Sequence, residues 1–281
     1  MLPLVILVWQ PTIHIHVARR ALEADMEAAR RLRQQIAADQ ITTGILATFH
    51  LWPGLVEILR NVGYDYMIVD MEHGAHPDDV VAEVCALGRL IDFPVLVRPV
   101  APEYPIVRRA IDLGPCGLMI PCVESAQTLD QVRDSIYMPP RGKRRPGGPG
   151  NRWVSDYQYA TWRQEVEEDI IVLPQIESRQ GLKNVDAIAQ HELTTALAIG
   201  PYDLSADLGV CWQPHDPRLV EAIRTLKAAA QTAGKKMWMI GDARTSLEQG
   251  FTFLCIGEPS MVLEEALRSM NGGAKGEGAS G

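Results

Sequence analysis

The stretch Ile170-Ile171-Val172-Leu173-Pro174-Gln175-Ile176, followed at once by Glu177, carries the pattern that decides the fold. It is apolar at nearly every position, which is typical of a parallel strand buried on both faces. An ionised carboxylate beside such a strand is costly unless something compensates its charge. A second carboxylate, Asp203, follows the apolar run at residues 195–199 in the same way. A shared divalent cation is the simplest compensator, and oxygen ligands favour Mg²⁺ or Mn²⁺ over zinc.

Apolar runs of strand length recur along the chain, with helical patterns between them. The runs cover residues 41–49, 66–71, 94–100, 117–123, 170–176, 195–199, 236–240 and 251–256. The helical patterns cover residues 27–38, 54–62, 78–91, 104–113, 126–135, 179–190, 217–233, 243–249 and 259–270. Eight strand–helix units in roughly 230 residues predict an α/β fold of the (β/α)₈ TIM barrel type. A doubly wound open sheet is the alternative, but no glycine-rich nucleotide loop follows the first strand.

The composition fits one globular domain. The chain has 281 residues, of which 47% are hydrophobic and 22% charged, and its formal net charge is −8. This acidic balance argues against a general nucleic-acid binder. The five cysteines include no Cys-x-x-Cys pair. Their scatter argues against a disulfide framework and favours a reducing, cytoplasmic location.

No linker divides the chain, so we expect a single barrel domain over residues 26–270. Residues 1–25 begin with an apolar run that is too short to span a membrane and lacks the basic start of a signal peptide. We therefore expect residues 1–25 to be an extension outside the barrel. Residues 271–281 are rich in Gly, Ala and Ser, which predicts a disordered tail.

Polar side chains follow four of the predicted strands at the point where each strand ends. His73 comes shortly after Asp70 at the end of the second strand, and Arg98 ends the third. Glu177 and Asp203 follow the fifth and sixth. Active sites of TIM barrels gather at the C-terminal strand ends, so we expect these groups to surround one cavity. A base, a guanidinium and two carboxylates are the groups needed to handle a small acid through a metal.

Chemistry assigns a role to each of these groups. Glu177 and Asp203 hold the cation, which a 2-oxo acid chelates so that an enolate is stabilised. Arg98 pairs with the substrate carboxylate through two parallel hydrogen bonds. His73 transfers a proton to or from a hydroxyl group.

Two further features extend this set. Gln175 lies on the same strand face as Glu177, because side chains alternate along a strand, and it is placed to orient a metal-bound water. The backbone around Gly200 and Pro201 is a candidate to receive the substrate carboxylate.

Each feature also has an ordinary structural interpretation. A single histidine or arginine at a strand end is most often a structural residue, and Asp203 fits a helix N-cap. Asp70 and Glu72 fit pairing with loop lysines. The basic loop at residues 139–150 is either a solvated surface or a lid for an anionic substrate. The functional interpretation gains weight because the residues fall at four strand ends of one predicted rim.

A set of short strings appears in order across about residues 40–265. They are Gly63-Tyr64-Asp65-Tyr66, Val69-Asp70-Met71-Glu72-His73, Val97-Arg98-Pro99, Ile111-Asp112-Leu113-Gly114, Ile120-Pro121, Pro139-Pro140-Arg141-Gly142, Gln175-Ile176-Glu177-Ser178, Ile199-Gly200-Pro201-Tyr202-Asp203-Leu204-Ser205 and Gly250-Phe251-Thr252-Phe253. Each string alone is weak. The ordered set resembles the HpcH/HpaI aldolase family, the metal-dependent class II pyruvate aldolases.

The resemblance implies a barrel of the phosphoenolpyruvate/pyruvate type that assembles as a homohexamer, with the last helix exchanged between neighbours. It implies Mg²⁺, Mn²⁺ or Co²⁺ on Glu177 and Asp203, the pyruvyl part of the substrate on Arg98, and His73 as the acid/base. Asp112 matches an acidic residue that, in relatives, reaches a neighbouring subunit's histidine and would raise its basicity. Asp70 would support the same network.

The implied activity is that of a lyase: reversible aldol cleavage of a 4-hydroxy-2-oxo acid to pyruvate and an aldehyde, through a metal-stabilised pyruvate enolate. An oxaloacetate-type decarboxylase is one alternative, because the same enolate serves both reactions. A CoA-ester lyase acting on citryl or malyl thioesters is another, with the basic residues 141–145 on the CoA phosphates. A non-catalytic oxo-acid-binding barrel is a fourth interpretation, which His73 and the metal pair disfavour. In every case the expected partners are small acids and further copies of the chain, without nucleic acid or membrane.

Overall fold

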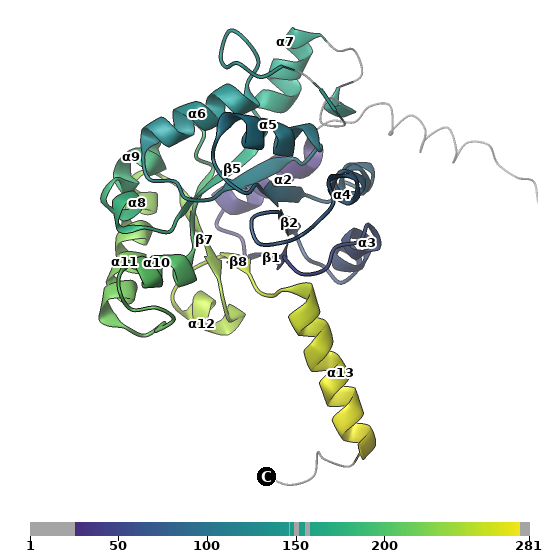
Figure 1. Ribbon diagram of the computed structural model, residues 1–281, viewed down its shortest axis with the longest axis vertical. Helices are drawn as coiled ribbons and strands as arrows, with labels where there is room; N and C mark the ends of the chain where they lie inside the picture. The colour runs from purple at the N-terminus through teal and green to yellow at the C-terminus, as the bar shows by residue number, and fades with distance from the viewer. Residues whose placement is uncertain (1–25, 146, 149–151, 155–157, 276–281) are drawn as a thin grey trace, which may run out of the picture.

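The computed structural model describes residues 26–145, 147–148, 152–154 and 158–275, and its centre is a closed barrel of parallel strands (Figure 1). The strands are β1 (Thr42–Ala47), β2 (Tyr66–Asp70), β3 (Val95–Arg98), β4 (Gly117–Ile120), β5 (Ile171–Ile176), β6 (Ala196–Ile199), β7 (Lys236–Ile240) and β8 (Phe253–Cys255). They follow one another around the barrel in chain order, and β8 pairs with β1. The predicted (β/α)₈ barrel is therefore confirmed, and the open sheet is wrong.

Helices connect the strands and cover the outside of the barrel. They are α2 (Glu27–Ala37), α3 (Gly54–Asn61), α4 (Asp78–Leu90), α5 (Tyr104–Asp112), α6 (Ala126–Ile136), α7 (Tyr159–Trp162), the π-helix η2 (Arg163–Glu167), α8 (Arg179–Lys183), α9 (Val185–Gln190), α10 (Pro201–Asp207), α11 (Pro217–Thr232), α12 (Ala243–Glu248) and α13 (Pro259–Lys275). The single helix predicted at residues 179–190 is two helices that meet at Asn184. The short elements α7, η2 and α10 were not predicted. Among the described helices, none has both the length and the apolar character needed to cross a membrane.

Helix α2 closes the N-terminal end of the barrel. Its Leu32 and Ile36 are buried against the core. On its polar side, Arg30 pairs with Asp169 at 2.6 Å, and Arg33 donates a hydrogen bond to the carbonyl of Ile170 just ahead of β5. The helix is therefore packed against the barrel.

Aromatic side chains fill the half of the barrel interior that is nearer the N-terminal ends of the strands. Tyr66 donates a hydrogen bond to the carbonyl of Leu254 at 2.7 Å and accepts one from the indole N–H of Trp238 at 2.8 Å. A Cβ at residue 44 would lie 2.3 Å from the Tyr66 ring, so glycine at that position makes room for it. This packing fills the barrel interior beneath the C-terminal strand ends.

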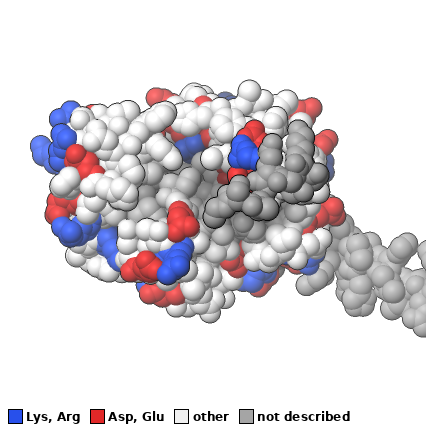
Figure 2. Space-filling model, turned by 90° about the horizontal axis from the view of Figure 1, so that it is seen from below, with Lys and Arg blue, Asp and Glu red and all other residues white. Residues whose placement is uncertain are grey.

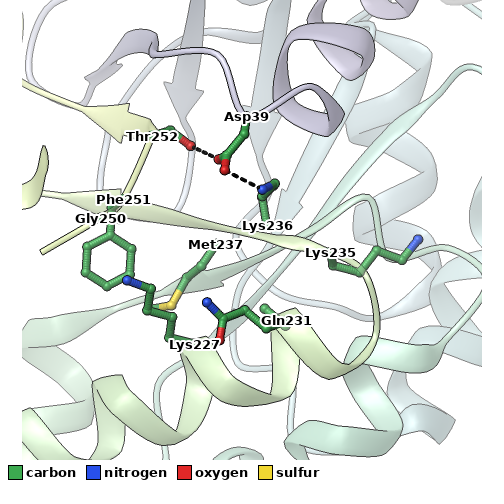
Figure 3. A pocket seen from close by; sticks show the side chains of 10 residues that line it. Asp39, Lys227, Gln231, Lys235, Lys236, Met237, Gly250, Phe251 and Thr252 are labelled. Carbon is green, nitrogen blue, oxygen red and sulfur yellow. Dashed lines mark hydrogen bonds and ion pairs between the residues drawn. The ribbon is translucent and has the colours of Figure 1, made fainter.

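A small hollow of about 70 Å³ lies where β7 and β8 begin (Figure 3). Asp39 pairs with Lys236 at 2.8 Å and accepts a hydrogen bond from the hydroxyl of Thr252 at 2.7 Å. Lys227 lies 4.6 Å from the ring centroid of Phe251. These contacts tie the start of the two strands to the chain ahead of β1. They lie at the end of the barrel opposite to the C-terminal strand ends.

The last helix, α13, extends away from the barrel body (Figure 1). It runs to Lys275, so the first five residues of the segment 271–281, predicted to be disordered, are helical. Residues 276–281 and the predicted extension 1–25 lie outside the described residues. On the face seen in Figure 2, charged side chains of both signs are interspersed and lie mainly toward the edge.

We expect Tyr66→Phe to lower the free energy of unfolding by about 1–3 kcal/mol, because it leaves the buried indole N–H of Trp238 without its partner and removes a buried hydrogen bond to Leu254. Urea unfolding followed by tryptophan fluorescence measures the change. Tyr202→Phe, at a hydroxyl on an exposed ring, is the matched control and should be nearly neutral. Equal effects from the two variants would contradict this assignment.

Candidate active site

The barrel brings the C-terminal ends of β2, β3, β5 and β6 to one rim. Asp70 and Arg98 are directly paired residues at the ends of β2 and β3. Gln175 and Ile176 pair with Ala198 and Ile199 in the same way, which places Glu177 beside Gly200. The C-terminal ends of these four strands therefore lie on one rim of the barrel.

A two-pronged ion pair between Asp70 and Arg98 forms the centre of this rim. Arg98 donates through Nε to Asp70 Oδ1 at 2.9 Å and through Nη2 to Oδ2 at 2.7 Å. Both side chains are buried. Asp70 also accepts the hydroxyl of Thr48 at 2.9 Å and the backbone N–H groups of Glu72 and His73 at 3.0 and 3.3 Å. The alternative that Asp70 pairs with loop lysines is thus wrong.

This pairing fixes the charge of both groups. Burial alone would raise the pKa of Asp70, but the hydrogen bonds and charge of Arg98 outweigh it and lower the pKa below its ordinary value. Burial alone would lower the pKa of Arg98, yet the hydrogen bonds and charge of Asp70 hold it above its ordinary value. Arg98 is therefore a permanent cation at the rim, and its Nη1 reaches Gln175 Oε1 at 3.4 Å.

Glu177 has a different environment from Asp70. Only 8% of it is exposed, and its Oε2 accepts the backbone N–H of Cys122 at 2.7 Å. A Cβ at Gly200 would lie 2.4 Å from Glu177 Oε1 and 2.9 Å from Gln175 Nε2, so glycine is required for this close approach. No lysine or arginine among the described residues lies within ion-pair distance of Glu177.

Negative charge accumulates around Glu177. Burial raises its pKa to about 7, and the charges of Glu72 and Asp203 act in the same direction. Burial also raises the pKa of Glu72, although Arg98 opposes the shift. The thiol of Cys122 has its pKa raised to about 12 by burial and by the carboxylates around it. A cation placed among these groups would relieve all three penalties.

Three donor atoms lie close enough together to hold a metal ion. A carboxylate oxygen of Glu72, one of Glu177 and the sulfur of Cys122 are all within 4.8 Å of one another. The sequence interpretation used Glu177 and passed over Glu72 and Cys122. The signal that indicated Glu177, a polar residue just after a buried strand, also applies to Glu72 and Cys122, because they follow the ends of β2 and β4.

Asp203 lies in the first turn of α10 and is exposed. It makes no cap hydrogen bond there, since the N-cap position is Gly200, so the alternative of an N-cap is wrong. Its charge acts on Glu72, Glu177 and Cys122, which places it beside the same cavity. Among the described residues, however, Asp203 is not part of the group of Glu72, Cys122 and Glu177 whose donor atoms lie within 4.8 Å of one another.

His73 lies at the mouth of the cavity. Its side chain is 58% exposed, and Nε2 is 3.8 Å from Glu72 Oε2. The backbone N–H of Gly200 is already bonded to the carbonyl of Ile176, and Pro201, which begins α10, has no N–H. The backbone at these two positions therefore does not supply the predicted donor for a substrate carboxylate, and Arg98 is the cation that faces the site.

Asp112 is held at the other end of the barrel. It is the last residue of α5, which descends from the end of β3 toward the start of β4. The buried Arg144 pairs with it at 2.8 Å and lies 5.0 Å from the ring centroid of Trp162. Within one chain Asp112 thus makes its contacts far from His73, and the predicted contact between them concerns a second subunit.

The basic loop is anchored along the outside of the chain's own barrel. Lys143 pairs with Asp134 on α6, and its carbonyl accepts the hydroxyl of Tyr104 at 2.8 Å. Arg141 lies 3.4 Å from Glu167 and 4.2 Å from the ring centroid of Tyr137. These contacts do not place the loop as a lid over its own chain's Glu177.

Residues 51–265 match the sequence profile of the HpcH/HpaI aldolase/citrate lyase family. The hydroxypyruvate/pyruvate aldolase of Pseudomonas aeruginosa is 30% identical over 260 residues, which cover 88% of this chain and 93% of that protein. A 2-keto-3-deoxy-L-rhamnonate aldolase of Escherichia coli is 31% identical over 218 residues, covering 76% and 81%.

Solved structures lead to the same group. The HpcH/HpaI aldolase of Desulfitobacterium hafniense superimposes with a TM-score of 0.76 at 28% identity, over 88% of this chain and 96% of that one. The similarity therefore extends through the barrel and the strand ends that carry the site.

With metal ions removed by a chelator, we expect the wild-type protein to lose stability relative to Glu177→Gln as the pH rises from 5 to 8. The folded-state pKa of Glu177 is raised from 4.5 to about 7, so its contribution is full below pH 4.5 and is lost through pH 7. The difference between the two free energies of unfolding should change by roughly 3 kcal/mol in favour of the variant.

Urea unfolding at the two pH values measures this difference, and saturating Mn²⁺ should remove the disadvantage of the wild type. Glu83→Gln, at an exposed helix position, serves as the control. A difference that stays constant with pH would show that the pKa of Glu177 is not raised in the folded protein.

Proposed function

This chain belongs to the HpcH/HpaI aldolase/citrate lyase family, and on that premise we propose that it cleaves a 4-hydroxy-2-oxo acid to pyruvate and an aldehyde, reversibly and with a divalent cation. It is a carbon–carbon lyase. The relatives that are about 30% identical to this chain are named as aldolases, one for hydroxypyruvate and pyruvate and one for 2-keto-3-deoxy-L-rhamnonate.

One observation carries the proposal: a fixed cation, Arg98, shares the cavity with a buried carboxylate that lacks a cationic partner, Glu177. A 2-oxo acid matches this arrangement. Its carboxylate suits the guanidinium, and its adjacent carboxylate and keto oxygens suit a metal ion held by Glu177. Because Nε and Nη2 of Arg98 are bonded to Asp70, a substrate carboxylate would meet the Nη1 side, where Gln175 lies at 3.4 Å.

The residues around Glu177 fit a divalent cation, because Glu72, Asp203 and Glu177 bring three negative charges together, and the one nearby cation among the described residues, Arg98, is already paired with Asp70 and Glu72. We assign Glu177, Asp203 and Glu72 as its oxygen donors, and Mg²⁺, Mn²⁺ or Co²⁺ as the ion. When bound, the cation polarises the keto group and stabilises the negative charge that develops on its oxygen.

The chain's own groups then carry the remaining steps. Arg98 binds the substrate carboxylate and is kept in place by Asp70. His73 accepts the proton of the 4-hydroxyl while the bond between C3 and C4 breaks. The C4 carbon leaves as an aldehyde, and the electron pair of the broken bond passes to C3. A water that Gln175, bonded to Arg98, helps to orient protonates C3 to give pyruvate, and the proton taken up by His73 replaces the one that the water gives up.

We further propose that the carboxylate of Asp112 from a second subunit pairs with the imidazole of His73. Asp112 is held in place by Arg144 at the end of the barrel opposite to His73, so one chain alone does not form this pair. A carboxylate delivered to the exposed His73 would fix its orientation and favour its charged form.

A second copy of the chain also has a surface on which to dock. Five apolar residues of α13 are exposed: Met261, Val262, Leu263, Leu267 and Met270. Beside the base of α13, a groove of about 710 Å³ is lined by Trp52, Ile58 and Val62 of the α3 region. An exposed apolar patch of this kind marks a docking surface. We propose that α13 of one subunit occupies this groove of its neighbour in a homo-oligomer, with a hexamer as the expected state.

The alternative reactions have less support. A CoA-ester lyase would need free cations in residues 141–145, but three of the four there, Arg141, Lys143 and Arg144, are engaged with acidic residues of their own chain. No feature of the described cavity favours decarboxylation over aldol cleavage. Five free cysteines, three of them buried, support our expectation that the protein works in the cytoplasm.

We expect purified protein to release pyruvate from 4-hydroxy-2-oxo acids with Mg²⁺, Mn²⁺ or Co²⁺ and to stop after EDTA treatment. Arg98→Lys should lower kcat/KM about 10- to 100-fold, because the ammonium cannot reproduce the two-pronged geometry. A lactate dehydrogenase-coupled assay measures pyruvate, and the exposed Arg244→Lys is the control. Metal-independent turnover, or none on a broad substrate panel, would count against the proposal.

We expect Leu267→Glu to reduce the molar mass of the assembly, because it places a charge on the apolar face of α13. Light scattering coupled to size-exclusion chromatography measures the mass. Glu264→Gln, on the same helix, should leave the assembly intact. A monomeric wild type would overturn the proposed exchange of α13.

A further inference from the structure

Cys122 occupies an unusual place at the rim. It follows β4 directly after Pro121, and its backbone has a φ of +53°, in the left-handed region that non-glycine residues rarely adopt. In this conformation its N–H points at Glu177 Oε2, 2.7 Å away. The same residue therefore presents both its backbone donor and its thiol to one cavity.

The thiol lies at metal-binding range of two carboxylates. Its sulfur and one oxygen each of Glu72 and Glu177 lie within 4.8 Å of one another. Metal–oxygen bonds of about 2.0–2.2 Å and metal–sulfur bonds of about 2.3 Å allow donors on opposite sides of one ion to be up to roughly 4.5 Å apart. Three donors spread evenly around one ion lie roughly 3.5–4 Å apart, so these atoms would move closer together by up to about 1 Å to hold a common ion.

The buried carboxylate of Glu177 independently points to an ion at this place. It is 8% exposed, and within the described part of the chain its hydrogen bonds come from the N–H and the thiol of Cys122, neither of which carries a positive charge. Asp70, by contrast, is neutralised by Arg98 at 2.7 Å. A buried carboxylate without such a partner is neutralised either by a proton or by a cation from outside the chain.

We propose that the sulfur of Cys122 is a direct ligand of the metal at this site, so that the protein binds thiophilic divalent cations, Co²⁺, Zn²⁺ and Cd²⁺, through mixed oxygen and sulfur coordination. This rests on the metal site put forward above for the lyase reaction. The thiol proton passes to solvent as the sulfur–metal bond forms, and no oxidation is involved.

Mixed coordination changes which metals the site prefers. Oxygen donors alone favour Mg²⁺ and Mn²⁺, whereas a thiolate adds affinity for softer ions. Mg²⁺ binding uses the carboxylates and gains little from the sulfur. Cys122 thus acts on metal selectivity more than on metal binding as such, and Cd²⁺ should compete with Mg²⁺ at concentrations far below it.

The test is titration of metal-free protein with Co²⁺ under reducing conditions, followed by absorption spectroscopy. Wild type should develop the strong near-ultraviolet band of sulfur-to-cobalt charge transfer, and Cys122→Ser should lack it. Cys211→Ser, at the other exposed cysteine, is the matched control and should keep the band. By calorimetry, Cys122→Ser should lower the ratio of Cd²⁺ to Mg²⁺ affinity roughly 10-fold or more.

The outcomes separate this proposal from the proposed reaction. If wild type binds Co²⁺ in calorimetry without the band, or if Cys122→Ser keeps the band, then the thiol is not a ligand and metal-dependent lyase activity still stands. If wild type binds none of the divalent cations, both proposals fail.

Discussion

The buried ion pair between Asp70 and Arg98 is the constraint on which the site depends. The parallel register of β2 and β3 places the two residues side by side, and neither charge is tolerable there alone. Once paired, Asp70 uses its remaining acceptor capacity to hold the N–H groups of Glu72 and His73. The same pair therefore fixes a substrate-binding cation and the loop that carries the predicted base.

Glu177 differs from Asp70 in one respect that has large consequences. Both carboxylates follow core strands, but the barrel gives Asp70 an arginine and gives Glu177 the uncharged N–H and thiol of Cys122. The raised pKa of Glu177, about 7, expresses this deficit. A fold that pairs one buried carboxylate and leaves its neighbour short of positive charge creates a place for a metal ion beside a fixed anion-binding group.

The two ends of the barrel have separate tasks. The N-terminal end is filled by Tyr66 and Trp238 and closed by α2, which supplies stability. The C-terminal end holds the charged groups, and its activity depends on second copies in our proposal, because Asp112 and α13 both face away from their own site. Stability and chemistry are thus separated along the barrel axis.

The sequence by itself determined the eight strands and the rim that carries Asp70, Arg98 and Glu177, because continuous apolar runs and the residues after them report burial locally. It did not predict α7 and α10, which are too short to show a helical period. Only the tertiary structure decided that Glu72 and Cys122 join Glu177, and that Arg144 holds Asp112. Those contacts join residues 32 to 105 positions apart, and their distances depend on register and backbone conformation, such as the left-handed turn at Cys122, which no local pattern encodes.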